Sequence, residues 1–290
     1  MITFSNHHSF EYVAASGALA YNGKGWPWEW PFRWLGLINP RLFTIFTKTL
    51  TYYSRKGNLR WWKPWGCVRL MNGGVVNAVG LTNPGISWWC DKIGPKLDPR
   101  LSIAVSILND DVIKIRVMAE MLNDFNIVAI ELNASCPNIG HDPQWNADAV
   151  IKSCEVIKQN SRHPLILKLG FEGDVKRITK GIKGIVEALS INSVPWSLRF
   201  PNTTSPLEHL GGGGVSGKIA QCETWELLSL LTCISDIPVI GPSVWEFEDI
   251  ERIRLRGAHA VSFGSLFLAH PHLPTRYAKK DIEARKKTVP

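Results

Sequence analysis

The stretch IAVSILNDDVIKIRVMAEMLNDFNIVAIELN, residues 103–133, decides the fold. It begins with a short apolar run, Ile103–Ile107, continues through a helix-like stretch, Asp111–Phe125, and ends in a second apolar run, Val128–Asn133. Two β-type runs separated by a segment of helix length are typical of a strand–helix–strand unit, whose two strands lie parallel in one sheet. This stretch therefore predicts an α/β protein with a parallel sheet.

The same alternation recurs along the chain, with further helix-like patterns at Ala147–Gln159, Asp174–Ala188 and Cys222–Ser235. Eight short runs are candidate strands: Tyr12–Ala15, Phe43–Lys48, Ile103–Ile107, Val128–Asn133, Leu165–Lys168, Leu189–Asn192, Val239–Ile240 and Ala260–Phe263. Eight strands that alternate with helices in a chain of 290 residues favour a closed (β/α)8 TIM barrel over an open sheet. Because no linker-like tract or internal repeat interrupts the pattern, we expect one domain spanning residues 1–290.

Two longer segments interrupt the barrel pattern. Leu59–Val76 follows the second predicted strand and carries a turn signal in Arg69–Gly74, which predicts an inserted hairpin. Val194–Gly214 contains three prolines and predicts a long loop. Long loops inside a compact domain tend to be lids or binding loops, so we expect both segments at the rim of the barrel mouth.

Composition excludes several classes of protein. No apolar run reaches the roughly 18 residues that span a bilayer. Met1–Phe10 is polar where a secretory signal needs an apolar stretch, so we expect a cytoplasmic protein without a transmembrane segment. The six cysteines include no Cys-x-x-Cys pair, which argues against a zinc ribbon or an iron–sulfur ligand set. We therefore expect free thiols and no metal site.

Charge and tryptophan content leave more than one partner open. A formal net charge of +8 is compatible with nucleic acid, an anionic membrane surface or small anionic ligands. The charge is not gathered into one long run, and the basic end Arg285–Pro290 is interpreted as a solvated tail. Nine of the thirteen tryptophans cluster in 26–34, 61–65 and 88–89. We favour packing under long loops over an exposed patch that meets a partner, a quinone-like acceptor or a membrane interface.

Small, amide or basic residues follow nearly every predicted strand, at the end where a barrel forms its active site. They are Ala15-Ser16-Gly17, Lys48-Thr49, Asn133–Asn138, Lys168, Asn192-Ser193, Gly241–Ser243 and Gly264-Ser265. The asparagines among them (133, 138 and 192) can converge, with Asn77 as a fourth. Because amides both donate and accept hydrogen bonds, such a ring suits a planar heterocycle with carboxylate and imide-like groups. Lys48 and Lys168 face the same basin, which favours an anion or cofactor site.

Two further features carry chemistry. Gly211–Gly217, with the sequence GGGGVSG, predicts a loop ahead of a helix whose backbone N–H groups cradle a phosphate. Cys136 lies in the turn between Asn133 and Asn138. It is either a small buried thiol or a proton acceptor held over a substrate carbon, and a thiol becomes a credible base where positive charge or hydrogen bonds lower its pKa.

Several of these motifs together resemble the dihydroorotate dehydrogenase family. Glu131-Leu-Asn-Ala-Ser-Cys-Pro-Asn138 is similar to its catalytic-loop motif, and Asn77-Ala-Val-Gly-Leu-Thr-Asn-Pro-Gly85 to its early substrate-binding segment. Gly213-Gly-Val-Ser-Gly217 resembles its phosphate loop. Ala14-Ala-Ser-Gly17 and Thr47-Lys48-Thr49 are similar to its first two flavin-contacting strand ends. The matches run in the right order from about residue 12 to residue 268.

The resemblance implies an FMN-dependent oxidation of dihydroorotate to orotate in de novo pyrimidine biosynthesis. Cys136 would remove the C5 proton while flavin N5 takes the C6 hydride, and a cysteine base marks the soluble class of the family. The substrate would be held by Asn77, Asn133, Asn138, Asn192 and Ser193. FMN would contact Ala15, Ser16, Gly17, Lys48, Thr49, Asn133, Lys168, Gly217, Gly241, Ser243, Gly264 and Ser265. Soluble relatives are usually dimers or larger, so a homodimer is expected, and an electron-transfer partner is possible.

The sequence also departs from the family pattern. The usual Gly-Gly-Ile after the seventh strand is here Gly241-Pro242-Ser243-Val244. Proline removes one backbone donor, so phosphate contacts there must involve other groups such as Ser243.

Two other enzyme functions are alternatives. One is a flavin-dependent reductase of another dihydropyrimidine, and the other is an enzyme similar to tRNA-dihydrouridine synthase. The chain offers no room for the helical RNA-binding domain of the latter, so no nucleic-acid partner is expected. A third alternative is a non-catalytic flavin-binding protein whose tryptophans meet a partner. The electron acceptor is left open between fumarate, NAD and a quinone.

Overall fold

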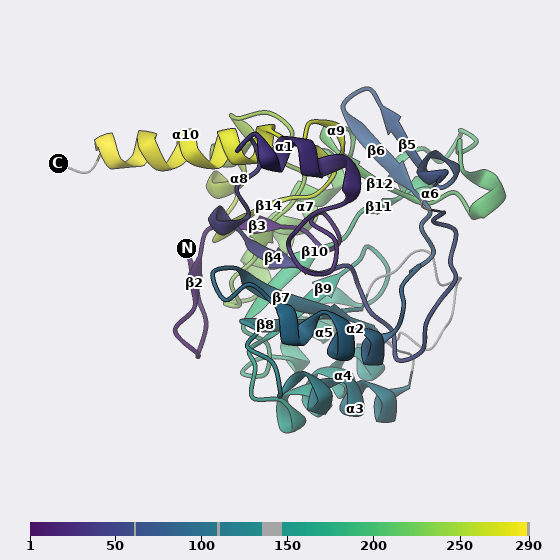
Figure 1. Cartoon of the computed structure of the whole chain (residues 1–290), viewed down its shortest axis with the longest axis vertical. Helices are drawn as coiled ribbons and strands as arrows, with labels where there is room; N and C mark the ends of the chain where they lie inside the picture. The colour runs from purple at the N-terminus through teal and green to yellow at the C-terminus, as the bar shows by residue number, and fades with distance from the viewer. Residues whose placement is uncertain (61, 109–110, 135–146, 289–290) are drawn as a thin grey trace.

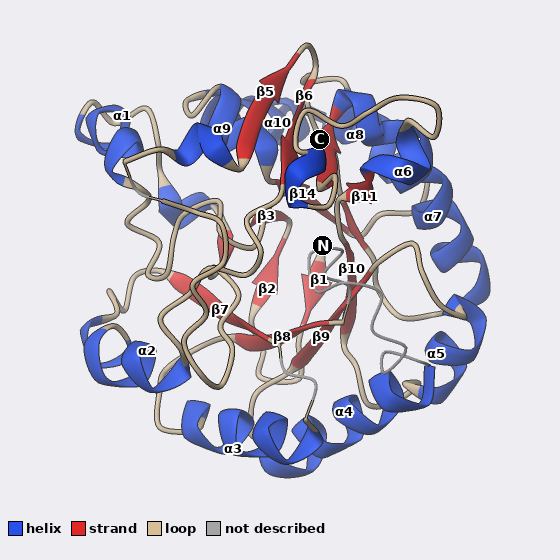
Figure 2. Cartoon of the chain, turned by 90° about the vertical axis from the view of Figure 1, so that its right-hand side faces the viewer, coloured by secondary structure: helices blue, strands red, loops and turns tan. Residues whose placement is uncertain are grey.

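In the computed structural model, which describes residues 1–60, 62–108, 111–134 and 147–288, a parallel sheet curls into a barrel (Figure 2). In sheet order, its strands are β10 (Ala188–Ile191), β9 (Leu165–Leu169), β8 (Ala129–Asn133), β7 (Ser102–Ile107), β4 (Thr44–Phe46), β3 (Tyr12–Ala14), β14 (Ala260–Phe263) and β13 (Ile240–Gly241). A parallel bridge between Leu189 and Val239 brings the two ends of this sheet together. The predicted (β/α)8 barrel is confirmed, and all eight predicted strands are present with their ends within two residues.

Helices cover the outside of the barrel (Figure 2). They are α2 (Ile86–Lys92), α3 (Val112–Leu122), α4 (Ala147–Asn160), α5 (Val175–Gly181), α7 (Gln221–Ile234), α8 (Asp249–Leu255), α9 (Ser265–Ala269) and α10 (Leu273–Thr288). Helix α5 is shorter than the predicted segment 174–188. A Cβ on Gly181 would lie 2.4 Å from Ile151, and Gly184 has a left-handed φ of +78°. The chain therefore packs tightly at Gly181 and turns at Gly184 toward β10.

Inward-pointing side chains of the strands form two layers of different chemistry. The layer nearer the N-terminal ends of the strands is apolar and consists of Val13, Phe46, Ala104, Ala129, Ile166, Ala188, Ile240 and Ala260. It packs against Ile2 and Phe10, which belong to the antiparallel strands β1 (Ile2–Thr3) and β2 (Ser9–Phe10). Figure 2 shows β1 and β2 at the centre of the ring of strands. Two residues further along four strands, the next layer is polar and contains Ser106, Glu131, Lys168 and Ser190.

The two insertions meet in a second, antiparallel sheet. Its order is β11 (Val194–Pro195), β12 (Gly214–Gly217), β6 (Gly74–Asn77) and β5 (Val68–Met71). The predicted hairpin is confirmed as β5–β6, and Gly73 in its turn has a φ of +77°. The prediction of a loop for Val194–Gly214 is wrong in part, because this segment contains β11 and the short helix α6 (Trp196–Arg199).

The glycine run also differs from its prediction. Gly214–Gly217 is strand β12 rather than a loop, and it pairs with β6, so that Gly214 lies opposite Asn77. A Cβ on Gly213 would lie 2.5 Å from the Asn77 carbonyl oxygen, so this glycine allows the two backbones to approach closely. The partner strand lies far away in the sequence, where a local pattern does not reveal it.

The C-terminal end is part of the folded structure. Helix α10 continues to Thr288, and Figure 1 shows it running past the body of the barrel to the C-terminus. The Arg285 guanidinium pairs with Glu11 and Asp281, and Arg254 lies 2.6 Å from Asp281. The prediction of a solvated tail is therefore wrong for Arg285, whose side chain is paired, whereas Lys286 and Lys287 are exposed on the helix. None of the helices in the described ranges combines the length and the apolar character needed to cross a membrane.

Candidate active site

A cavity of about 570 Å³ opens at the end of the barrel where the parallel strands finish. Its floor is formed by residues that follow barrel strands, and its walls by the β5–β6 hairpin, β12 and the loop ahead of α1 (Trp30–Trp34). Small-molecule sites are usually clefts of roughly 300–1,000 Å³ lined mainly by apolar groups with a few fixed polar ones. The cavity has the size and the composition of such a site.

Fourteen of the residues predicted from the sequence line this one cavity: Ala15, Ser16, Gly17, Lys48, Thr49, Asn77, Asn133, Lys168, Asn192, Ser193, Gly217, Ser243, Gly264 and Ser265. These fourteen residues converge on one cavity as predicted, and their roles there stay predictions. Gly241 is buried in β13 and is not among the lining residues. A Cβ on it would lie 2.0 Å from Ile253, so packing against α8 accounts for this glycine. Cys136 and Asn138 lie outside the described residues.

A buried ion pair forms part of the floor. Glu131 is 1% exposed, and its Oε1 lies 3.8 Å from the Nζ of Lys168. Ser106 Oγ donates a hydrogen bond of 2.7 Å to Oε1, and Ser190 Oγ donates one of 3.0 Å to Oε2. Burying a carboxylate is costly unless a cation and hydrogen-bond donors compensate it, and here both are present. The arrangement holds the ammonium group of Lys168 beside the cavity.

A chain of hydroxyl groups connects this ion pair to Asn133. Thr49 Oγ1 lies 3.0 Å from Ser106 Oγ and accepts a hydrogen bond of 3.1 Å from Asn133 Nδ2. Thr49 Oγ1 also lies 3.1 Å from Ser16 Oγ, which donates to the Thr47 carbonyl at 2.9 Å. Because both serines use their protons on other acceptors, the Thr49 hydroxyl donates to one of them and accepts from Asn133. The Asn133 amide is thus held in one orientation.

Two glycines permit close approaches at the edge of the cavity. Gly17 has a φ of +83°, and a Cβ on it would lie 3.0 Å from Cδ of Lys48. Gly217 has a φ of +95°, and a Cβ on it would lie 2.8 Å from the carbonyl oxygen of Gly73. A side chain at either position would strain the backbone and displace Lys48 or the hairpin turn. The short contacts explain why both positions are glycine.

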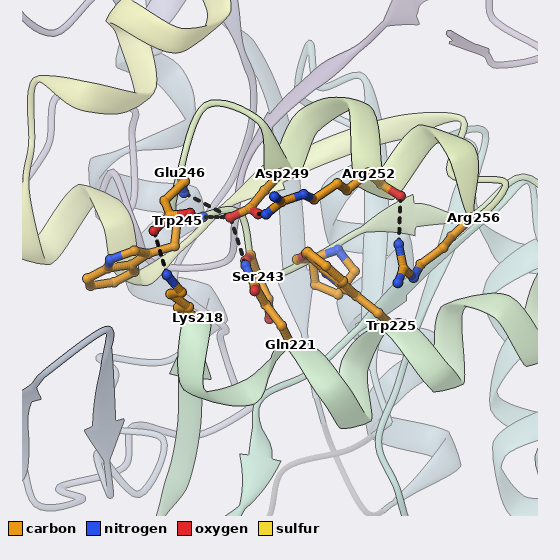
Figure 3. A network of polar contacts seen from close by, with 10 residues as sticks. Lys218, Gln221, Trp225, Ser243, Trp245, Glu246, Asp249, Arg252 and Arg256 are labelled. Carbon is orange, nitrogen blue, oxygen red and sulfur yellow. Dashed lines mark hydrogen bonds and ion pairs between the residues drawn. The ribbon is translucent and has the colours of Figure 1, made fainter.

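A network around Asp249 holds the loop after β13 (Figure 3). The buried carboxylate of Asp249 accepts hydrogen bonds from the backbone N–H groups of Trp245 and Glu246 at 3.0 and 2.8 Å. It also accepts one of 2.7 Å from Gln221 Nε2, which in turn donates to the Ser243 carbonyl at 3.0 Å. Ser243 lines the cavity and has a left-handed φ of +65°, a conformation that costs a non-glycine residue roughly 1–2 kcal/mol. The network therefore keeps Ser243 in a strained but defined position.

The apolar wall was not expected from the sequence. It includes Trp26, Trp28, Trp65 and Leu70. The rings of Trp26 and Trp28 stack with their centroids 5.4 Å apart, and Trp26 Nε1 donates a hydrogen bond of 2.8 Å to the Gly17 carbonyl. This bond ties the loop ahead of α1 to the strand end after β3. The clustering of tryptophans was the available signal, but it does not say which rings face the cavity.

Glu29 is a second lining residue that sequence reasoning missed. Its side chain is 2% exposed, and Oε2 accepts a hydrogen bond of 2.7 Å from the Trp26 backbone N–H. Burial raises the pKa of Glu29 to about 7, and the backbone bond opposes this shift. A carboxyl group that titrates near neutral pH therefore lines the apolar wall of the cavity.

None of the cysteines that the structure describes lines the cavity. Burial raises the pKa of the Cys154 thiol to about 12 and that of the Cys90 thiol to about 11. Such thiols stay protonated at neutral pH and are poor proton acceptors. The role of Cys136 as a base stays a prediction from its sequence motif.

Comparison with known proteins gives a consistent result. A model of the family described as dihydroorotate dehydrogenase matches residues 36–276. The chain is 27% identical over 273 residues to "Dihydroorotate dehydrogenase B (NAD(+)), catalytic subunit" of Enterococcus faecalis, covering 86% of this chain and 84% of that protein. It is 29% identical over 261 residues to "Dihydroorotate dehydrogenase A (fumarate)" of Lactobacillus helveticus, covering 83% of each.

A solved structure supports the fold. The ligand-free dihydroorotate dehydrogenase from Eimeria tenella superimposes with a TM-score of 0.67 and covers 93% of this chain and 86% of its own. The two sequences are 14% identical, so this likeness shows a shared barrel architecture and carries no information on individual residues.

Proposed function

This chain belongs to the dihydroorotate dehydrogenase family, and from that premise we propose that it binds FMN and oxidises dihydroorotate to orotate in pyrimidine biosynthesis. It is an oxidoreductase acting on a CH–CH bond. The observation that carries the proposal is the single cavity lined by Lys48, Lys168, Asn77, Asn133 and Asn192, together with the glycine and serine strand ends.

The described residues fit a flavin mononucleotide. Bound FMN supplies a two-electron acceptor, and its ring gains negative charge on reduction, which the two lysines that line the cavity would stabilise. The phosphate would be held by Gly217, Ser243, Gly264 and Ser265. Gly217 packs against Trp245 in the loop after β13, and β13 pairs with β14, so these four residues lie on one side of the cavity. Backbone N–H groups and hydroxyls gathered on one side suit a phosphate group.

The asparagines suit the substrate. Dihydroorotate carries a carboxylate and imide-like groups, and amide side chains can both donate to and accept from such groups. Asn133 is oriented by Thr49, and Asn77 Nδ2 donates to the Gly214 carbonyl at 3.4 Å. These contacts reduce the number of side-chain rotamers that binding must order, so the ring of amides is partly organised before the substrate arrives.

Cys136 is proposed as the group that accepts the C5 proton of dihydroorotate at its Sγ. The support is its motif, in which Asn133 at one end is placed at the cavity and the cysteine follows three residues later. Lys48 and Lys168 add positive charge to the same basin, and positive charge favours a thiolate. Asn138 completes the proposed substrate ring on the same sequence grounds.

The proposal is tested by anaerobic reduction of the purified protein. We expect the protein to carry a yellow FMN chromophore that bleaches on addition of dihydroorotate. Cys136→Ala should retain FMN but bleach at least about 100-fold more slowly, since general-base catalysis contributes roughly 10²–10⁴-fold. Bound FMN that dihydroorotate never reduces would overturn the substrate assignment, and a protein that cannot be loaded with FMN would overturn the cofactor.

The electron acceptor and assembly form the remaining part of the proposal. The two relatives described above are named for NAD(+) and for fumarate. A cytoplasmic homodimer, with or without an electron-transfer partner, is our proposal for this chain. Reoxidation of the reduced protein with fumarate, NAD and a soluble quinone in turn would identify the acceptor.

A further inference from the structure

Large apolar side chains are exposed on this protein, and three of them, Trp28, Trp65 and Leu70, line the cavity. Of the eleven tryptophans that the structure describes, six are among the exposed large hydrophobic residues: Trp28, Trp30, Trp34, Trp62, Trp65 and Trp88. Trp34 is 78% exposed at the end of α1, beside the exposed Leu35, and Leu70 is exposed on the hairpin. The prediction that these rings pack under loops therefore holds only for part of the set. Scattered single residues need no explanation, but a cluster of this kind marks an interaction surface.

The positive charge of the chain is concentrated in the same part of the sequence. Residues 30–90 contain eight lysines and arginines and no aspartate or glutamate. The other 25 lysines and arginines are balanced by the chain's 25 aspartates and glutamates, so this segment carries the whole formal net charge of +8. The sequence showed no single basic run, because the eight cations are spread over sixty-one residues.

Five of these cations are exposed on the segment that enters the hairpin: Arg55, Lys56, Arg60, Lys63 and Arg69. Within the described ranges, none of the five forms an ion pair with a carboxylate. Their neighbours Leu59, Pro64, Trp65 and Leu70 line the cavity. The segment that carries these cations therefore borders the cavity.

The two tryptophan-bearing segments meet at one opening. Trp28 precedes α1 and Trp65 precedes β5, and both line the same cavity. Figure 2 shows α1 and the β5–β6 hairpin on the same side of the barrel mouth. We call the exposed residues within 28–37, 55–60 and 62–70 the tryptophan rim. It combines indole rings and leucines with positive charge that no carboxylate of the described residues pairs.

We propose that the tryptophan rim docks on the surface of an anionic lipid bilayer. Indole rings prefer the membrane interface, and lysines and arginines are attracted to an anionic membrane surface. The cores of protein–protein interfaces share the enrichment in tryptophan and arginine but are depleted in lysine, so Lys56 and Lys63 favour the lipid surface. Nucleic acid could bind the cations through its phosphates and the rings by base stacking. It offers no apolar surface against which Leu35 and Leu70 could be buried. The lipid surface satisfies the rings, the leucines and the cations together, and the proposal does not depend on the reaction.

The test uses the full-length protein and sedimentation with vesicles. We expect binding to vesicles of phosphatidylcholine mixed with phosphatidylglycerol, weak binding to pure phosphatidylcholine, and weaker binding as salt is raised. The double variant Lys56→Glu/Lys63→Glu should lower the partition coefficient about tenfold or more. The double variant Lys286→Glu/Lys287→Glu changes the net charge equally on exposed positions of α10 and should bind like the wild type.

A second variant tests the apolar contribution. Trp34→Ser/Leu35→Ser should reduce binding several-fold at high salt, where the electrostatic attraction is screened, and an unchanged circular dichroism spectrum would show that it folds. Equal loss in the α10 variant, equal binding to neutral vesicles, or binding to RNA in preference to anionic vesicles would each overturn the proposal.

Discussion

Charged side chains are buried and paired on the floor of the cavity, whereas on the rim they are exposed. On the floor, the carboxylate of Glu131 is buried, and Lys168, Ser106 and Ser190 compensate it. On the rim, five cations are exposed without a carboxylate partner in the described ranges, beside exposed indole rings. The floor is organised internally, whereas the rim is arranged to interact with something outside the molecule.

This difference indicates that side-chain positions are fixed on the floor and not on the rim. A buried pair that is fully hydrogen-bonded has one arrangement, which suits a group that must meet a cofactor at a defined position. Exposed charges and rings contribute little to folding, so the rim can change without loss of the barrel. Mutations in the two regions are therefore expected to have opposite effects on stability and on docking.

The largest effect is expected on the floor, from Glu131→Ala. The substitution leaves Lys168 buried without its carboxylate and both serine hydroxyls without their acceptor, which should cost about 3–5 kcal/mol of unfolding free energy. Urea denaturation measures the loss. The matched control is Glu155→Ala, which breaks the exposed pair of Glu155 with Lys152 and should cost less than about 1 kcal/mol. Equal losses in the two variants would show that the floor pair is not specially coupled.

Glu29 should give the next largest effect, because it is a buried carboxyl group in the apolar wall of the cavity. Its pKa is about 7 in the folded protein against a usual value of 4.5, so the folded state binds more protons between these values. Its contribution to stability is therefore fully present below about pH 4.5 and is lost as the pH rises through 7. Relative to Glu29→Gln, the wild type should lose up to about 3 kcal/mol between pH 4.5 and 8. A pH-independent difference between the melting temperatures of the two proteins would contradict the burial argument.

A pair of glycine substitutions sharpens the comparison further. Both Gly217 and Gly211 have left-handed φ values, of +95° and +86°. Gly217→Ala should cost about 2–3 kcal/mol, because the Cβ would also meet the hairpin turn at 2.8 Å. Gly211→Ala, with nothing within 4 Å of its Cβ, should cost only about 1 kcal/mol from backbone strain. Thermal unfolding of both variants measures the contrast, which disappears if β12 does not pack against the turn.

The smallest effect on stability is expected on the rim. Trp34→Ser removes a ring that is 78% exposed, so its unfolding free energy should stay within about 0.5 kcal/mol of the wild type. The same variant should still be reduced by dihydroorotate at the wild-type rate. A loss of several kcal/mol would mean that the ring is packed in solution and that the rim is not a free surface.

The sequence predicted the fold and most of the strand-end residues that line the cavity for a physical reason. Strand and helix periods are local, so all eight strands were visible. The carboxyl ends of parallel strands meet at one end of a barrel, so the amino-acid sequence alone was enough to place Lys48 and Lys168, 120 residues apart, in one basin. In this fold, residues that follow different strands lie close together even when they are far apart in the sequence.

The features that were missed depend on pairing or burial outside the barrel. Gly214–Gly217 was predicted as a loop because its partner, β6, lies far earlier in the chain. Glu29 was not predicted, because nothing local shows that its side chain is buried. Asp249 and Gln221 act through the backbone of the loop after β13, and their positions on neighbouring helices give no motif.

Rapid mixing of oxygen-free, FMN-loaded protein with dihydroorotate tests the central claim most directly. The wild type and the rim variant Lys56→Glu/Lys63→Glu should reduce their flavin at the same rate, while Lys168→Met, altered on the floor, should be slowed by at least about tenfold. Flavin that stays oxidised in the wild type, or a rim variant slowed as much as the floor variant, would contradict the assignment of the chemistry to the floor of this cavity.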